Sequence, residues 1–178
     1  MEQLSLLRIV LVTVMGLNAC ANAQEQEAGK RRATVNQEST VVFVCEHGSA
    51  KSVIAAVHFN KLASERGSKL RAVSRGTNPD VEIAPNTVRG LEADGLAAGE
   101  QRPKKLSQTD VAGAARVVTF CELPEGFDNL APVERWDDVP PVSEDYAKAR
   151  DAMVGRIKRL LDELESKKQP TVSRDKPS

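Results

Sequence analysis

The feature that most constrains the fold is a strand-like run that passes directly into a loop and a helix. Residues 40–45 (TVVFVC) are all apolar or β-branched, which is typical of a strand buried on both faces of a parallel sheet. Residues 49–67 then place apolar side chains near helical spacing and end at Gly67, a residue type that often ends helices. Strand, loop and helix in this order predict an α/β fold.

Further segments continue the alternation of strand and helix. Residues 69–74 and 116–121 read as strands, and residues 132–136 as a short strand at the sheet edge. Pro85 opens a helix through Ala93, and a last helix begins near Ser143 as its N-cap. That helix repeats apolar residues at steps of three and four: Tyr146, Ala149, Met153, Ile157, Leu160 and Leu164. We therefore expect a three-layer sandwich, with a small four-stranded parallel sheet and helices on both faces.

Charge and composition exclude several classes of partner. The chain has 25 basic and 25 acidic residues among 178, so no bulk attraction to nucleic acid or anionic lipid is expected. Aromatic residues make up 3%, too few for a surface that stacks unpaired bases. We expect no nucleic-acid partner, and any anion must be recognised locally.

The first 23 residues have the pattern of a secretory signal peptide. Their apolar run, IVLVTVMGL, is too short to span a bilayer and is followed by small residues. Two cleavage sites compete: residues 21–23 (ANA) suit release of a soluble protein, whereas Cys20 would carry a lipid anchor if residues 17–20 act as a lipoprotein box. The sequence thus predicts an exported protein, periplasmic or lipid-tethered. A misassigned start codon would make it cytoplasmic.

The two polar ends flank a single domain. Residues 24–39 lack apolar periodicity and are interpreted as a disordered tether, and residues 168–178 as a disordered tail. The length suits one compact domain, which we place at residues 40–167. We expect a monomer without a transmembrane span.

The loop from Cys45 to Ser52 carries the chemistry. It lies where a strand meets a helix, and such helix N-termini favour the thiolate form of a cysteine and offer backbone N–H groups to a tetrahedral oxyanion. Gly48 allows the backbone to curl around the anion. Ser52 is positioned to donate a hydrogen bond to the sulfur, and Lys51 adds a positive charge over the anion.

These residues resemble the low-molecular-weight protein tyrosine phosphatases and the thioredoxin-coupled arsenate reductases that share their fold. The family signature is a cysteine, five residues, then arginine and serine or threonine. Cys45 and Ser52 match it, and residues 75–79 (RGTNP) are similar to the family's small-Gly-Thr-x-Pro turn. The order continues through residues 117–121 (VVTFC) and Trp136. The resemblance covers nearly all of the domain.

This chain departs from the signature at two positions. Lys51 stands where the family has arginine, and Gly48 where it has asparagine. A lysine is a point charge, whereas arginine grips two phosphate oxygens at once, so slow turnover is expected. The family's general acid lies in a later loop, and here the resemblance implies Asp138, or else Asp137.

By this resemblance the protein is a cysteine-dependent phosphatase. Its expected substrates are phosphotyrosine in proteins or small aryl phosphates, cleaved through a phosphocysteine intermediate without a metal or cofactor. Catalysis is assigned to Cys45, Lys51, Ser52 and Asp138. Substrate binding is assigned to the rest of the loop: Glu46, His47, Gly48, Ser49 and Ala50.

Two other functions stay open. The first is reduction of arsenate by Cys45 and Cys121, because Cys121 falls where the arsenate reductases have their second redox cysteine. Cys121 is therefore either a redox partner of Cys45 or a core residue. Their third cysteine has no counterpart in residues 122–129, which breaks the usual relay. Alternatively, Lys51 marks a non-catalytic module that binds phosphate. His47 is interpreted as exposed loop and His58 as packing or surface, since neither has metal-ligand spacing.

Overall fold

The computed structural model describes residues 40–99 and 102–168. The predicted signal peptide, lipid anchor, tether and nearly all of the predicted tail lie outside these residues. The last helix runs to Lys168, one residue past the predicted end of the domain.

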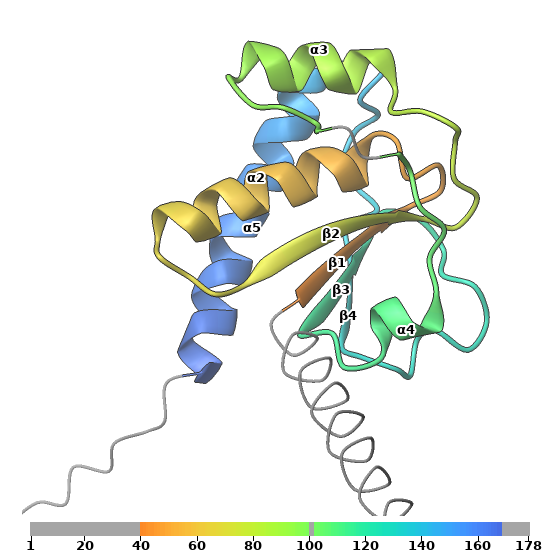
Figure 1. Ribbon diagram of the computed structural model, residues 1–178, viewed down its shortest axis with the longest axis vertical. Helices are drawn as coiled ribbons and strands as arrows, with labels where there is room; N and C mark the ends of the chain where they lie inside the picture. The colour runs from red at the N-terminus through yellow and green to blue at the C-terminus, as the bar shows by residue number, and fades with distance from the viewer. Residues whose placement is uncertain (1–39, 100–101, 169–178) are drawn as a thin grey trace, which may run out of the picture. The chain divides into compact units, whose positions relative to one another are not determined.

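Four parallel strands form the sheet (Figure 1). They are β1 (Thr40–Cys45), β2 (Arg71–Gly76), β3 (Arg116–Thr119) and β4 (Val133–Arg135), in the spatial order β2-β1-β3-β4. β1 is central and pairs with β2 and β3, and the short β4 forms an edge beside β3. The predicted α/β fold with a four-stranded parallel sheet is confirmed.

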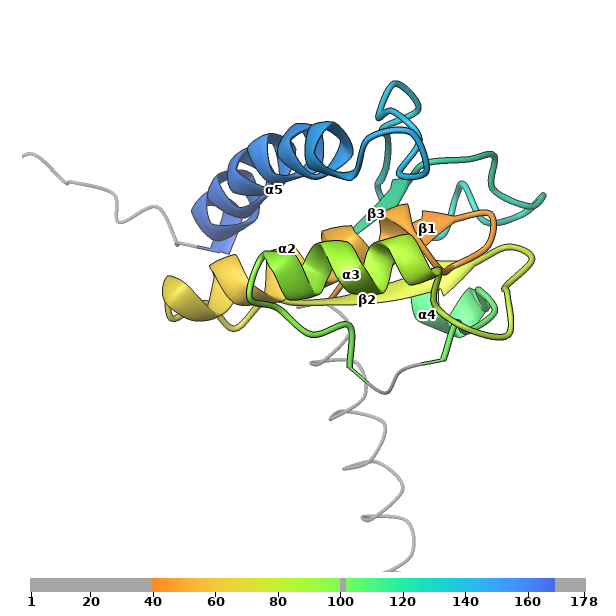
Figure 2. The same cartoon turned by 90° about the horizontal axis from the view of Figure 1, so that it is seen from above.

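Helices cover both faces of this sheet (Figures 1 and 2). α2 (Lys51–Glu65) and α5 (Tyr146–Lys168) pack on one face, and the short α4 (Gln108–Val111) lies on the other. α3 (Pro85–Ala93) packs against α2 and α5. The sequence reading found three of these helices but missed α4, which a capping box between Ser107 and Asp110 begins.

The central strand supplies both cores because its side chains alternate between the faces. Val41, Phe43 and Cys45 belong to the larger cluster, with α2 and α5, whereas Val42 and Val44 belong to the smaller one, beside α4. All five are buried, as expected for an inner parallel strand. The carboxyl end of β1, and with it Cys45, is thereby fixed between two packed layers.

The last helix buries the apolar stripe predicted for it. Five of its members are 5% exposed or less: Ala149, Met153, Ile157, Leu160 and Leu164. The helix begins later than expected, because Asp145 rather than Ser143 accepts a hydrogen bond from the N–H of Lys148 at its start, at 2.9 Å. The three-residue spacing of that bond identifies Asp145 as the N-cap.

The second strand lies two residues further along the chain than predicted. Its register pairs Thr40 with Arg71 and Cys45 with Gly76, so it ends level with β1. Gly76 lies against Gly48, and a Cβ on Gly48 would come within 2.9 Å of the Gly76 nitrogen. Two glycines therefore let the end of β2 and the loop of residues 45–52, here called the anion loop, approach closely.

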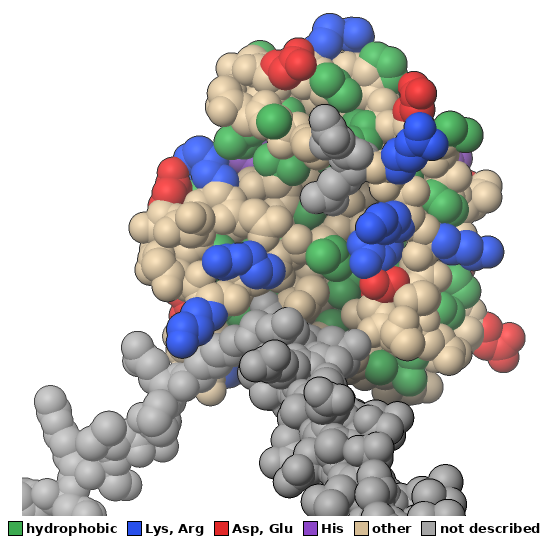
Figure 3. Space-filling view, in the orientation of Figure 1, with side chains coloured by type: hydrophobic (Ala, Val, Ile, Leu, Met, Phe, Trp, Pro, Cys, Tyr) green, Lys and Arg blue, Asp and Glu red, His purple; other side chains and the backbone are tan. Residues whose placement is uncertain are grey.

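Basic side chains on the face drawn in Figure 3 lie in separate places, with acidic and apolar ones between them. Arg102, Lys104 and Lys105 are all exposed. No helix within residues 40–99 and 102–168 is both long and apolar enough to cross a membrane.

Candidate active site

Cys45 is the last residue of β1, and α2 begins six residues later at Lys51. The loop between them therefore stands at the carboxyl edge of the sheet, beside the central strand, where open parallel sheets bind ligands. Gly48 has φ +61°, a left-handed conformation that favours glycine, and it turns the loop back toward the helix. The strand and helix on either side are rigid supports for this loop.

The segment after β2 binds the carbonyl groups of the loop. N–H groups of this segment donate to loop carbonyls in four bonds: Thr77 to Cys45 at 3.2 Å, Asn78 to Glu46 at 2.8 Å, Asp80 to His47 at 2.9 Å and Ala84 to Ser49 at 3.1 Å. In the described part of the chain, by contrast, no acceptor takes the N–H groups of residues 46–50. Those N–H groups are available to an anion.

The N-terminus of α2 adds to this positive potential. Its N-cap residue, Ala50, has no side chain that caps the helix, and the first turn contains no acidic residue. A helix of 15 residues carries a partial positive charge at this end, which is neutralised neither by a cap nor by a carboxylate of its own first turn. The loop and the helix end together present donors and a positive potential that suit an anion.

The nucleophile predicted from the sequence lies next to a hydroxyl group. The Sγ of Cys45 is 3.0 Å from the Oγ of Ser52, which is fully buried. A serine hydroxyl can donate to a thiolate, so this contact stabilises the charged sulfur when the thiol ionises. The structure thus brings Cys45 and Ser52 together as predicted.

Lys51 lines the same cavity as Cys45, and one of its N–H groups is already bonded. Its Nζ donates to the carbonyl oxygen of Val139 at 2.6 Å. An ammonium group has three donors, which leaves two for a ligand. Lys51 therefore joins the anion loop to the loop after β4, a role that the sequence reading did not foresee.

A cavity of about 690 Å³ opens above the thiol. Beyond the loop residues, it is lined by Phe120 and Cys121 after β3, by Asp80, by the start of α3 and by Pro141–Ser143. This volume falls within the range of sites for organic ligands. The lining joins the polar loop to apolar side chains such as Phe120 and Val142, which suits a molecule that carries both an oxyanion and an organic group.

The two predicted acids are not among the residues that line this cavity. Asp138 binds both terminal nitrogens of Arg156, which also lies over the Trp136 ring, at 5.7 Å. The hydrogen bond from Arg156 holds the pKa of Asp138 below its ordinary value. Asp137 binds Arg135 instead. A catalytic role for either aspartate stays a prediction that this geometry does not favour.

The sequence reading missed two charged residues that do line the cavity, Asp80 and Arg89. Ser49 Oγ donates to Asp80 Oδ2 at 2.6 Å, and His47 Nδ1 lies 3.4 Å from Asp80 Oδ1. Arg89 projects from α3, and its guanidinium bonds the neutral side chain of Asn86. A positional signal existed for Asp80, since it follows the turn after the second strand, at the ligand-binding edge.

The second cysteine lines the cavity too. Cys121 lies in the loop after β3, where its backbone N–H donates to the hydroxyl of Thr119 at 3.2 Å. Burial raises the pKa of the Cys121 thiol, although its contact with the Thr119 hydroxyl lowers that pKa in part. The protonated thiol is therefore favoured in the resting protein.

His58 lies away from this cavity and packs in the core of the helical layer. It is 8% exposed, and its Nε2 is 3.4 Å from Asp94. Burial lowers the pKa of His58, although the nearby Asp94 raises it in part. Of the two readings left open, packing is confirmed.

Fold and site define a class: α/β proteins with a cysteine-headed anion loop at the edge of a parallel sheet. The sequence profile described as low molecular weight phosphotyrosine protein phosphatase matches residues 40–135, more than half of the chain. The chain therefore belongs to this family. No curated protein sequence matches the chain.

Solved structures of phosphatases and arsenate reductases share the fold. YfkJ from Bacillus subtilis is 20% identical with a TM-score of 0.65, over 73% of this chain and 96% of its own. The low molecular weight protein tyrosine phosphatase from T. tengcongensis is 22% identical with a TM-score of 0.58, over 70% and 98%. An arsenate reductase from Archaeoglobus fulgidus is 28% identical with a TM-score of 0.55, over 68% and 98%. Family and fold thus indicate phosphatase-like or arsenate-reductase-like function.

Proposed function

We propose that this protein is a cysteine-dependent phosphatase that hydrolyses phosphotyrosine or small aryl phosphates. The thiolate of Cys45 attacks phosphorus, the bond to the leaving oxygen breaks, and a phosphocysteine forms. Water then attacks the same phosphorus, the S–P bond breaks, and phosphate leaves with the thiolate restored. Ser52 steadies the sulfur, while the loop N–H groups and Lys51 hold the phosphoryl oxygens.

The observation that carries this proposal is the sulfur of Cys45 beside Ser52, within a loop whose N–H groups have no acceptor in the described residues. Preorganised donors of this kind stabilise the charge that develops on phosphoryl oxygens. Because these donors are fixed by backbone bonds to residues 77–84, they need no rearrangement when substrate binds.

The size of the cavity favours an organic substrate over a bare oxyanion. About 690 Å³ is far more room than one phosphate needs, and Phe120 and Val142 offer apolar contacts to an aromatic leaving group. An aryl phosphate would use both the polar loop and these apolar side chains.

The test is release of inorganic phosphate from 4-nitrophenyl phosphate by the full chain. We expect Cys45→Ser to lower the rate by more than about a thousand-fold, since the nucleophile is lost. Circular dichroism of the variant should match the wild type. Equal rates in the two proteins would eliminate the mechanism. Binding of phosphate by calorimetry without any turnover would point instead to a non-catalytic binding module.

A second candidate function, reduction of arsenate, is favoured by one observation: Cys121 lines the same cavity as Cys45. In this reaction Cys45 adds to arsenate with loss of water. Cys121 then attacks the Cys45 sulfur, the S–As bond breaks with its electron pair on arsenic, and arsenite leaves. The two cysteines have supplied two electrons, and an added dithiol reduces the resulting disulfide.

Substitution of Cys121 separates the two candidates. Arsenate reduction predicts arsenite production that requires added dithiol and falls to background in Cys121→Ser. The phosphatase proposal predicts that Cys121→Ser still hydrolyses 4-nitrophenyl phosphate. Arsenite production that is undiminished in Cys121→Ser would rule out the intramolecular pair.

A further inference from the structure

The proposed phosphatase reaction needs a group that protonates the leaving oxygen, and the described residues restrict the choice. Glu46 and Asp80 are the carboxylates that line the cavity within residues 40–99 and 102–168. A general acid must lie within hydrogen-bond reach of the oxygen it protonates, directly or through one water. Asp137 and Asp138 do not line this cavity, and each is already paired with an arginine.

Asp80 is also held in place from two directions. Its backbone N–H donates to the carbonyl of His47 at 2.9 Å, and its side chain accepts from Ser49 at 2.6 Å. Ser49 belongs to the anion loop and is 3% exposed. The Glu46 backbone is also held, by Asn78, but its side chain has no such partner: His47 Nε2 is 3.9 Å away, and the side chain is 65% exposed against 47% for Asp80. Of the two carboxylates, Asp80 has the fixed position that proton transfer requires.

The partners of Asp80 and Asp138 differ in what they allow chemically. The two side chains beside Asp80 are the hydroxyl of Ser49 and the imidazole of His47, at 3.4 Å. A hydroxyl, like an imidazole in its neutral form, can donate or accept, so these contacts survive when the carboxylate gains a proton. A guanidinium only donates, so the pair of bonds from Arg156 stabilises only the charged form of Asp138. An acid that must carry a proton in one step and lose it in the next needs the first kind of partner.

We propose that Asp80 is the general acid and base of this site, an inference that rests on the phosphatase activity proposed above. As the P–O bond breaks, protonated Asp80 gives its proton to the leaving oxygen, which departs as an alcohol or phenol. The Asp80 carboxylate then takes a proton from the water that attacks the phosphocysteine. Phosphate is released and Asp80 is protonated again, so the cycle balances.

The dependence on the leaving group tests this role. With the full chain, rates are measured on 2,4-dinitrophenyl, 4-nitrophenyl and phenyl phosphate, whose leaving groups increase in basicity. Because general acid catalysis contributes most for basic leaving groups, Asp80→Asn should lower the rate on phenyl phosphate by about a hundred-fold or more, and on dinitrophenyl phosphate by less than about ten-fold. Glu82→Gln, in the same segment but outside the lining of this cavity, is the matched control and should lose nothing.

Competitive inhibition by inorganic phosphate reports separately on the anion loop. It should be unchanged in Asp80→Asn, since the loop N–H groups remain; weaker inhibition in parallel with the lost rate would assign Asp80 to loop structure and overturn the proposal. If Asp80→Asn does not fold, Asp80→Ser removes the carboxyl with a residue that turns tolerate, and the same comparison applies.

The competing acid is examined in the same series. A loss that grows with leaving-group basicity in Asp138→Asn, but not in Asp80→Asn, would overturn the inference in favour of Asp138. Failure of the underlying function looks different, because then Cys45→Ser keeps the wild-type rate on all three substrates.

Discussion

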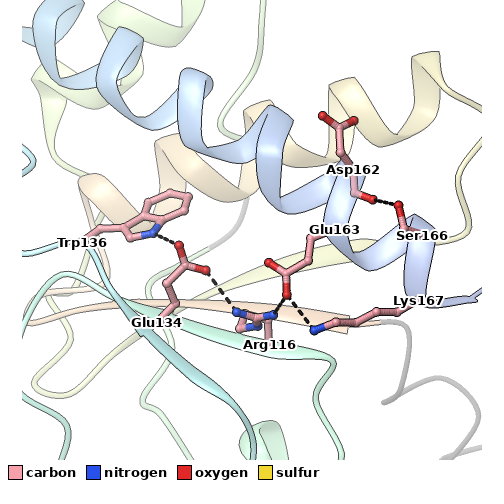
Figure 4. A network of polar contacts seen from close by, with 7 residues as sticks. All are labelled: Arg116, Glu134, Trp136, Asp162, Glu163, Ser166 and Lys167. Carbon is pink, nitrogen blue, oxygen red and sulfur yellow. Dashed lines mark hydrogen bonds and ion pairs between the residues drawn. The ribbon is translucent and has the colours of Figure 1, made fainter.

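At the carboxyl end of β1, backbone N–H groups and the ammonium group of Lys51 retain donors that a ligand can use. At the amino end of β3, by contrast, the charged groups are paired with one another. There Arg116 binds Glu134 of β4 and Glu163 of α5, and Lys167 binds Glu163 as well (Figure 4). Glu134 also accepts from the indole N–H of Trp136 at 2.7 Å.

The difference shows how one sheet separates stability from chemistry. Arg116 is only 12% exposed and tied to two carboxylates, so its charge joins strands and helix and is not free for a ligand. Around Cys45, the segment after β2 binds loop carbonyls and leaves loop N–H groups without acceptors in the described chain. Substitutions of the paired charges at the first end should change the free energy of unfolding, and substitutions of the side chains that line the cavity at the second should change the rate of reaction.

Among the substitutions that compare the two ends, the largest expected effect is a gain of activity at the site. Lys51→Arg supplies a guanidinium that grips two phosphoryl oxygens, and a recovered charge-assisted hydrogen bond of about 1.5 to 3 kcal/mol corresponds to roughly ten- to two-hundred-fold faster turnover. Steady-state hydrolysis of 4-nitrophenyl phosphate measures it. Lys61→Arg, on the same helix but paired with Glu65, is the control and should change nothing. An unchanged rate in Lys51→Arg would show that the lack of a bidentate guanidinium is not what limits turnover.

Gly48→Ala tests whether the loop can be altered without cost to the fold. The new Cβ meets the Gly76 nitrogen at 2.9 Å in addition to the positive φ, so we expect a loss of about 2 to 3 kcal/mol in the free energy of unfolding. Urea denaturation measures it. Gly67→Ala has a similar φ of +66° with no atom within 4 Å, so it isolates the conformational strain. Equal losses in the two variants would contradict a tight contact between loop and strand.

Arg116→Met should weaken the fold and leave the chemistry intact. It removes a largely buried cation from between two carboxylates that stay partly exposed, at a cost of about 1 to 2 kcal/mol. Urea denaturation gives the loss, and hydrolysis per folded molecule should match the wild type. Arg135→Met, at an exposed ion pair, should scarcely change stability. A reduced rate in folded Arg116→Met would break the proposed separation of the two ends.

The smallest expected effect is a pH dependence at Asp94, which is paired with α5 away from both ends. Burial alone would raise the pKa of Asp94, but hydrogen bonds from Tyr146 and Arg150 outweigh it and lower this pKa below the ordinary 3.8. The stabilisation is therefore present above pH 3.8 and is lost as the pH falls through the lower, folded-state value. Wild type should exceed Asp94→Asn in stability at pH 7 and approach it in strong acid. A difference in the free energy of unfolding between wild type and Asp94→Asn that stays constant with pH would contradict this pairing.

Local patterns predicted most of the fold. The β-branched run at residues 40–45, Pro85 at a helix start and the stripe of α5 each reflect a preference that acts over a few residues, and each appears in the structure. Boundaries were less secure: the N-cap is Asp145 rather than Ser143, and β2 extends to Gly76 because it pairs with β1 along its whole length. The pairing register depends on distant residues and leaves little trace in the strand's own composition.

The sequence by itself determined the α/β class, the position of Cys45 at a strand end and its neighbourhood with Ser52, because these follow from hydrophobic period and from short separation along the chain. Only the tertiary structure decided which partner each charged side chain binds: Lys51 the carbonyl of Val139, 88 residues away, Asp138 the guanidinium of Arg156, and Asp80 the hydroxyl of Ser49. Such contacts depend on how separate elements pack, and a charged side chain carries no local sign of its partner. The sequence reading therefore identified the candidate nucleophile but not the carboxylate that we propose as its general acid.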